Sequence, residues 1–157
     1  MESNFQNLNH YEIFEIPQGF LFTTAQGIEY TVYFINGEEY LPNQSYSKDL
    51  YVFGFQSKTK SAYDKRVGET IIKILNQFFT ESKNLIVYSC DQSDRKENAR
   101  KKLFDNWFNA YGLIDFIKID FHFDDSLFVS VIYRKDNPNL KDIEYSLNQF
   151  GKSLYNK

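Results

Sequence analysis

Apolar and polar residues alternate over residues 19–36, which is the pattern of half-buried β-strands. The alternation pauses at Thr24–Gly27 and resumes from Ile28 to Phe34. This pause predicts a hairpin turn in which the glycine supplies a positive φ. A third strand is predicted over residues 50–55, where aromatic residues occupy every second position. The chain therefore opens with three strands.

From about residue 64 the apolar residues recur at helical spacing, and they predict an amphipathic helix over 64–80. Either Ser61 or Asp64 can cap its first turn. Residues 85–90 are almost continuously apolar, as in a central strand that is buried on both faces.

A capping box then opens a second predicted helix, over about 94–111. Alternation over 117–123 and again over 127–133 predicts a hairpin. Asn137 followed by Pro138 predicts the start of a last helix. The predicted order is β-β-β-α-β-α-β-β-α. We expect an α/β fold of the α+β kind, with a mixed, mostly antiparallel sheet of about six strands flanked by three helices.

The length of 157 residues predicts a single domain over 1–157. Apolar residues make up 42% of the chain and charged residues 25%, which excludes wholesale disorder. The 16 Phe and 12 Tyr favour β-structure.

Cys90 is the single cysteine, so no internal disulfide and no oxidising compartment are implied. The first residues lack the basic and apolar regions of a signal peptide, and no apolar stretch has the length of a transmembrane helix. We expect a soluble, bacterial-type cytoplasmic protein with no membrane partner. The exposed edge of a hairpin-rich sheet makes a homodimer plausible.

The net charge of −3 gives no general attraction to nucleic acid, but cations gather in two segments. The first, residues 58–66, leads into the first predicted helix. There Lys65, Arg66 and Gly68 offer an anion-binding helix start. The alternative is an ordinary first turn whose cations are solvated and whose glycine permits close packing.

The second cluster surrounds the start of the second predicted helix. It consists of Arg95, Lys96, Arg100, Lys101 and Lys102. These residues are candidates for binding phosphate or nucleic acid, and the alternative is a merely solvated helix face. The proposed topology places both clusters on one edge of the sheet, as a phosphorylated ligand would require.

Asp91 and Asp94 follow the predicted central strand, where active sites of sheet proteins are common. Asp91 is a candidate base, and the pair is a candidate metal site. The alternative is that Asp94 caps the next helix while Asp91 pairs with an arginine. The absence of a Glu-x-Lys companion disfavours a metal nuclease. Since the two histidines lie far apart, a zinc site is not expected.

Over about residues 50–134 the element order resembles the core of the GCN5-related N-acetyltransferases (GNAT). In that family an antiparallel meander leads into a helix, a parallel strand, another helix and a final hairpin. Lys65-x-x-Gly68-x-Thr70 is similar to the family's Gln/Arg-x-x-Gly-x-Gly/Ala signature. Asn98-Ala99 to Leu103-Phe104 and Gly112-Leu113 look like its Asn-x-x-Ala … Leu-Tyr … Gly-Phe helix.

The resemblance implies that Lys65, Arg66, Gly68 and Thr70 hold the pyrophosphate of acetyl-CoA. Phe104 lies near the position where the family often has a tyrosine that acts as general acid. Residues 50–55 contain no carboxylate that could act as base. Asp91 is then the best available base, acting through a water. An active acyltransferase also requires a β-bulge that splays the third strand from the central one, and Gly54 permits such a bulge.

Two functions are therefore expected alternatives. The first is an acyl-CoA-dependent N-acyltransferase-like domain, either active or catalytically degenerate, whose partner is a CoA ester. The second is a non-catalytic module that presents its aromatic hairpins or basic helix to a protein or nucleic acid. The chain also looks like a family of short bacterial proteins of unknown function, mainly around residues 90–108.

Overall fold

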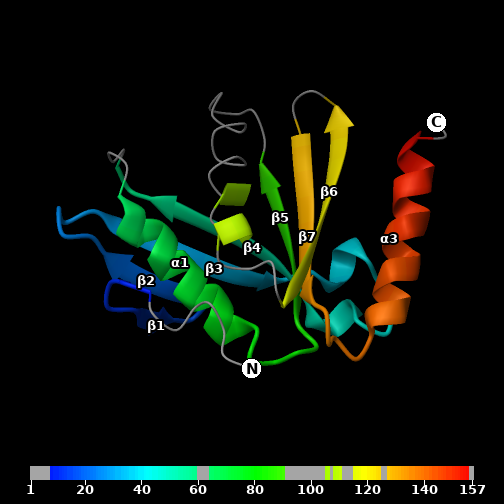
Figure 1. Ribbon diagram of the computed structural model, residues 1–157, viewed down its shortest axis with the longest axis horizontal. Coiled ribbons are helices and arrows are strands. Elements are labelled where there is room, and N and C mark those ends of the chain that lie inside the picture. Colours follow the sequence, from blue (N-terminus) through cyan, green and yellow to red (C-terminus); the bar gives the residue numbers. More distant parts are fainter. Residues whose placement is uncertain are drawn as a thin grey trace.

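A computed structural model of the protein shows a seven-stranded sheet with helices on both faces (Figure 1). It describes residues 8–59, 64–90, 105–106, 108–110, 115–124 and 127–155. The strands are β1 (Phe14–Ile16), β2 (Gly19–Thr23), β3 (Glu29–Asn36), β4 (Leu50–Ser57), β5 (Leu85–Cys90), β6 (Phe116–Asp124) and β7 (Leu127–Arg134). The helices are α1 (Lys65–Phe78) and α3 (Leu140–Tyr155), with 3-10 turns η1 (Glu38–Tyr40) and η2 (Ser47–Asp49). Residues 105–106 and 108–110 are also helical.

The strand order across the sheet is β1-β2-β3-β4-β5-β7-β6. Neighbouring strands are antiparallel except β4 and β5, which are parallel and are joined through α1. The predicted α+β class and mostly antiparallel sheet are confirmed. The seventh strand is β1, which pairs Phe14 with Leu21 and Ile16 with Gly19. Its three residues are too few to show the alternation that identifies a strand.

The predicted hairpin turn at Thr24–Gly27 is confirmed. Gly27 has a φ of +80°, and the Thr24 N–H donates to the Ile28 carbonyl at 2.9 Å. The positive φ is one that L side chains rarely adopt, so this position favours glycine.

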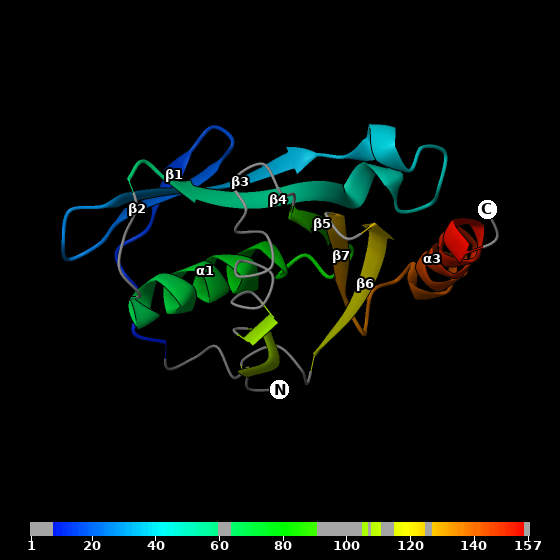
Figure 2. The same ribbon diagram turned by 90° about the horizontal axis from the view of Figure 1, so that it is seen from above.

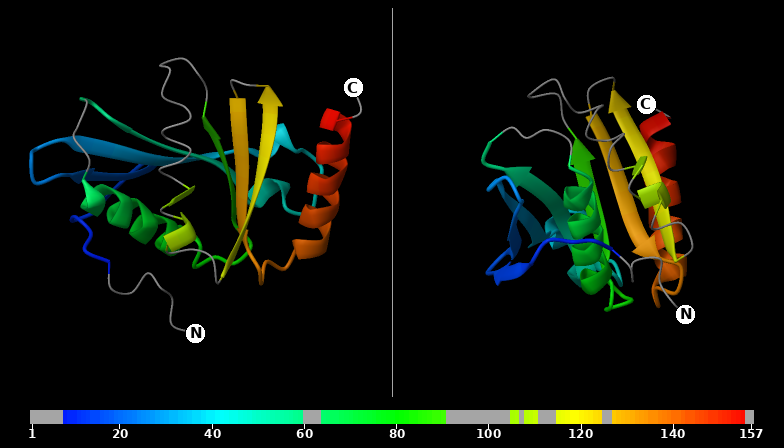
Figure 3. Two further views of the ribbon diagram at one scale, coloured as in Figure 1. Left: turned by 45° about the horizontal axis from the view of Figure 1, so that its top comes forward. Right: turned by 60° about the vertical axis from the view of Figure 1, so that its left-hand side comes forward.

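The central strand β5 is buried on both faces, as predicted. Its alternation sends Leu85 to the face covered by α3, and Ile86 and Tyr88 to the face covered by α1. We call these the α3 face and the α1 face. Figure 2 and Figure 3 show the two helices on opposite sides of β5, β7 and β6.

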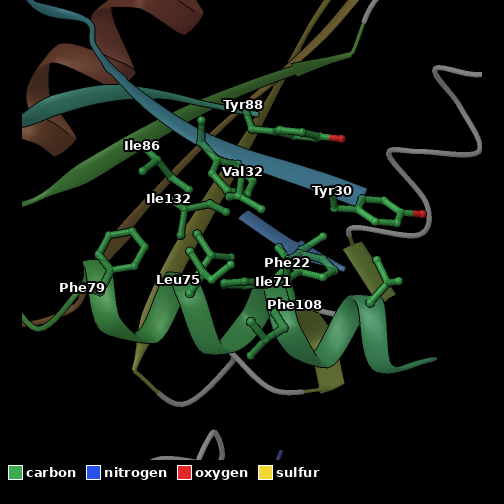
Figure 4. Packing of buried hydrophobic residues seen from close by; sticks show 14 of the residues in the cluster. Phe22, Tyr30, Val32, Ile71, Leu75, Phe79, Ile86, Tyr88, Phe108 and Ile132 are labelled. Carbon is green, nitrogen blue, oxygen red and sulfur yellow. The ribbon is translucent and has the colours of Figure 1, made fainter. Parts of the chain in front are cut away.

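The larger core lies between α1 and the sheet (Figure 4). Ile71, Leu75 and Phe79 share this core with buried side chains from the six strands β2 to β7. The sheet residues labelled there are Phe22, Tyr30, Val32, Ile86, Tyr88 and Ile132. Apolar positions at helical spacing in α1 therefore meet the aromatic alternation of β2 and β3, which explains the high aromatic content.

The smaller core lies under α3, where Ile143 and Leu147 are buried. α3 begins at Leu140, two residues later than the Asn137-Pro138 pair predicts, and the Asn137 Oδ1 accepts the Asn139 N–H at 2.8 Å in the turn that leads into the helix. The Ser45 hydroxyl donates to Asp142 Oδ2 at 2.6 Å and ties the loop before β4 to this helix. In the described part of the chain, no helix is both long enough and apolar enough to cross a membrane.

Candidate functional site

The two parallel strands of the sheet separate before they end. Residues of β4 and β5 pair from Leu50 with Leu85 to Phe53 with Tyr88. Among the described residues the pairing stops there, although β4 continues to Ser57 and β5 to Cys90. Figure 1 shows the two strands diverging. We call this region, residues 54–57 of β4 with 89–90 of β5, the strand fork.

No β-bulge accompanies the strand fork within β4, all of which the structure describes. The register of β4 with β3 is unbroken from Tyr51 opposite Asn36 to Ser57 opposite Tyr30. Gly54 instead lies under the ring of Tyr33, and an added Cβ would be 2.1 Å from the Tyr33 hydroxyl oxygen. The β-bulge that an active acyltransferase would require is therefore absent from β4: Gly54 accommodates the Tyr33 ring, and β4 departs from β5 together with β3.

Aromatic rings line the α1 face where the strands separate. The Tyr88 ring is parallel to that of Phe55 at a centroid distance of 6.3 Å, and its centroid is 5.8 Å from that of Phe53. Phe53 and Tyr88 are buried, and Phe55 is half-buried. The strand fork therefore has an apolar wall beside the ends of two parallel strands, a common location for ligands in mixed sheets.

The first turn of α1 is capped by a carboxylate. Asp64 Oδ1 accepts the Arg66 N–H at 2.9 Å, and the Asp64 carbonyl accepts the Val67 N–H at 3.0 Å. Of the two predicted caps, Asp64 is therefore the one used. A negative group at this end is favoured by the helix dipole.

A segment far away in the sequence packs on this cap. We call residues 9–11 the N-terminal strap. The Tyr11 hydroxyl donates to Asp64 Oδ2 at 2.5 Å, and the Tyr11 N–H donates to Thr70 Oγ1 at 2.8 Å. The guanidinium carbon of Arg66 lies 3.8 Å from the centre of the Tyr11 ring. Burial raises the pKa of Tyr11, and the hydrogen bond to Asp64 raises it further.

The four residues predicted to bind a cofactor all lie in α1, but they are used differently. The Lys65 side chain is exposed and lies 3.9 Å from Glu69 Oε1. Arg66 donates to the carbonyls of Asn9 and His10, both at 3.3 Å. Gly68 and Thr70 are buried. At the start of α1, Lys65 thus remains directed to solvent, whereas Arg66 and Thr70 contact the strap.

The other predicted site residues lie outside the described part of the chain. These are Asp91, Asp94, Arg95, Lys96, Arg100, Lys101 and Lys102, together with Phe104. In the described residues no group of three or more His, Cys, Asp and Glu side chains is placed to hold a metal ion.

A polar network on the α1 face was missed by the sequence analysis. Lys118 Nζ lies 2.6 Å from Asp105 Oδ1 and 2.5 Å from Asp120 Oδ1, and the Ser130 hydroxyl donates to Asp120 Oδ1 at 2.6 Å. Ser130 is the cross-strand neighbour of Tyr88, so this network continues the row of side chains that starts at the strand fork. Lys118 and Asp120 alternate with apolar residues of β6, and this alternation alone does not indicate that they meet other polar groups. The one sequence feature that could have indicated this network is Ser130, a polar residue within an otherwise apolar strand.

Comparison with known proteins adds a family but no activity. The model of a family of unknown function, DUF6169, matches residues 63–151, which is more than half of the chain. The match runs from just before α1 into α3 and includes β5, β6 and β7. No curated protein and no solved structure matches the chain.

Proposed function

The chain belongs to DUF6169, a family of unknown function, and from its geometry we propose a cytoplasmic acyl-CoA-binding domain similar to the GNAT core. The strand fork is the observation that carries this proposal. It separates two parallel strands beside an aromatic wall, at the ends where ligands of mixed sheets bind.

An extended ligand with amide groups suits such a fork. A chain that lies between two separated strands meets backbone N–H and C=O groups, as an added strand does. The pantetheine arm of CoA is extended and carries amides, and its acyl end is apolar. The rings of Phe53, Phe55 and Tyr88 offer that end an apolar contact.

The phosphate end of the ligand does not fit α1 as this helix stands. The proposal assigns the pyrophosphate to Lys65, Arg66, Gly68 and Thr70, but Asp64 and the strap lie against the same turn. A carboxylate there repels phosphate. The aromatic wall therefore suits the acyl and pantetheine end of CoA better than the first turn of α1 suits its phosphates.

We expect binding to be accompanied by weak catalysis at most. Residues 50–57 contain no Asp or Glu, and Phe104 has no hydroxyl to serve as an acid. The base assigned by this proposal is Asp91, acting through a water molecule. The lack of these groups favours a domain that binds acyl-CoA but is catalytically degenerate.

Thermal and urea unfolding with acetyl-CoA tests the proposal. A ligand that binds only the native state stabilises it by about 2.7 kcal/mol at a hundredfold excess over Kd. Phe55→Ala is expected to weaken affinity about tenfold or more, since it removes a ring from the wall. Phe20→Ala is the matched control, because Phe20 is also half-buried against the same core but lies in β2.

The expected result is a shift with acetyl-CoA that Phe20→Ala retains and Phe55→Ala loses. No stabilisation by acetyl-CoA or CoA at millimolar concentration would remove the proposal. Equal losses in both variants would place the ligand away from the strand fork.

A second candidate, a protein-binding module, is favoured by an uncovered face. The face of β1–β4 that points away from α1 is covered by neither α1 nor α3, as Figure 2 shows. Phe14 is 51% exposed and Ile35 46%, with Leu21, Tyr33 and Val52 half-buried between them. Clustered exposed apolar side chains mark interaction surfaces. An uncharged centre can face a copy of itself, so the partner proposed is a second copy of this chain.

Sedimentation equilibrium tests this homodimer. We expect the wild type to associate at high concentration and the double variant Phe14→Ser with Ile35→Ser to remain monomeric, because two polar groups would be buried in the contact. Tyr40→Ser is the control, since Tyr40 is 73% exposed but lies in η1, outside these strands. A wild type that stays monomeric at every concentration would contradict the second candidate.

A further inference from the structure

We infer that the Tyr33 hydroxyl is a ligand-binding group of the strand fork, which donates a hydrogen bond to the thioester carbonyl of a bound acyl-CoA. The inference rests on the proposed function and names the residue by which the fork recognises the acyl group. Tyr33 lies in β3, which β4 separates from β5, and the end of its side chain extends over β4.

A glycine at the start of the fork sets the position of this hydroxyl. Phe53 with Tyr88 is the last pair between the two parallel strands, so Gly54 is the first residue of β4 beyond the pairing. Gly54 is also the partner of Tyr33 in the ladder of β3 with β4. A Cβ at Gly54 would overlap the Tyr33 hydroxyl oxygen. The glycine therefore lets the hydroxyl lie against the β4 backbone at the point where the fork opens.

The Tyr33 hydroxyl is available to a ligand. The side chain is half-buried, and its hydroxyl makes no hydrogen bond to another residue in the part of the chain that the structure describes. The neighbouring side chains on this face of the sheet, Leu21, Ile35 and Val52, are apolar. A phenolic O–H is both a donor and an acceptor. One polar group placed on a largely apolar surface is the usual means by which a binding site orients its ligand.

The fork therefore has different chemistry on its two faces. The aromatic wall lies on the α1 face. On the opposite face the Tyr33 hydroxyl lies over Gly54, and Ser89, which follows the last paired residue of β5, is exposed. An acyl group is apolar apart from its carbonyl oxygen. At the closed end of the fork its hydrocarbon part meets the rings, and its carbonyl oxygen meets a hydroxyl that can donate to it.

Calorimetric titration of acetyl-CoA and of CoA into the full chain isolates this contact. CoA carries a thiol where acetyl-CoA carries the thioester, so only acetyl-CoA offers the carbonyl. We expect the wild type to bind acetyl-CoA more tightly than CoA. Tyr33→Phe keeps the ring over Gly54 but lacks the hydroxyl, so this preference should fall by about fivefold while the affinity for CoA stays the same.

Tyr51→Phe is the matched control. Tyr51 is also a half-buried tyrosine, but it lies in the part of β4 that is paired with β5. This variant should keep the wild-type preference for acetyl-CoA.

A spectroscopic readout makes the test independent of affinity. The NMR resonance of an isotope-labelled carbonyl carbon in acetyl-CoA moves downfield when the carbonyl oxygen accepts a hydrogen bond. We expect this displacement on the wild type and on Tyr51→Phe, and a smaller one on Tyr33→Phe.

The outcomes separate the inference from the proposed function. A loss of the preference and of the downfield displacement in Tyr33→Phe alone supports the inference. If acetyl-CoA binds but Tyr33→Phe keeps both, or loses affinity for CoA and acetyl-CoA equally, the inference is overturned and the proposed function stands. A wild type that binds the two ligands equally well overturns it in the same way. If the wild type binds neither ligand, both are overturned.

Discussion

The buried side chain of Tyr133 makes the stability of the protein depend on pH. It lies in β7 with no exposed surface, and burial raises its pKa to about 12. An unfolded tyrosine ionises near pH 10, so the folded state resists an ionisation that the unfolded state allows. The stability that Tyr133 contributes is therefore complete below pH 10 and is lost as the pH rises toward 12.

The prediction is a difference between two pH profiles. Between pH 8 and pH 11 the ionisation of Tyr133 should remove about 1.4 kcal/mol from the free energy of unfolding of the wild type. The variant Tyr133→Phe cannot ionise at this position, so its free energy of unfolding should fall by about 1.4 kcal/mol less than that of the wild type over the same pH range. Urea unfolding at the two pH values measures both slopes. Parallel profiles would show that Tyr133 does not titrate in this way.

The residue scale is also where local sequence patterns fail. The Asp64 cap could be predicted, because its hydrogen-bond partner Arg66 lies only two positions away in the sequence. Tyr11 is 53 positions from Asp64, and no periodicity connects them. Ser130 and Asp120 likewise meet because two strands pair in one register. Interactions of this kind depend on the assembled sheet, so the strap and the polar network could not be predicted.

At the scale of elements, α3 is attached by a narrow apolar stripe. Leu147 is 5% exposed and packs in the smaller core, whereas Tyr145 is 68% exposed on the same helix. Leu147→Ala leaves a cavity and is expected to lower the free energy of unfolding by about 2–5 kcal/mol. Tyr145→Ala should change it by less than about 0.5 kcal/mol.

Urea unfolding measures this pair, and CoA titration supplies a second readout. The strand fork carries its aromatic wall on the α1 face, and α3 covers the opposite one. Leu147→Ala should therefore reduce stability without altering CoA affinity. A loss of stability as large in Tyr145→Ala would mean that α3 is not held by this stripe.

The elements themselves were predictable where the signal is local. Alternation with a glycine turn predicted β2 and β3, and the helical spacing predicted α1 and α3 within a few residues. The three residues of β1 carry too little pattern. The role of Gly54 was not predictable either: the sequence shows only that it permits a bulge, and in the structure it accommodates the Tyr33 ring from the neighbouring strand.

For the molecule as a whole, the class of fold was predicted but the strand order was not. The insertion of β7 between β5 and β6 depends on which strand edges meet, and alternation within a strand carries no such information. The same holds for the start of α1. Arg66 and Thr70 were expected to hold an anion, whereas in the structure they contact the strap, which lies 56 and 59 positions away in the sequence.

The single parallel junction has a consequence for how the chain folds. β1 to β4 form a ladder of sequential hairpins, and β6 and β7 form another, whereas β4 and β5 join the two groups through only four residue pairs. Hairpins close short loops quickly, but a parallel pair must first bring together residues 35 positions apart, such as Leu50 and Leu85. The antiparallel pair of β5 with β7 is also long-range, since Leu85 pairs with Tyr133, 48 positions away. We therefore expect β5 to join the sheet on both sides later than the hairpins form.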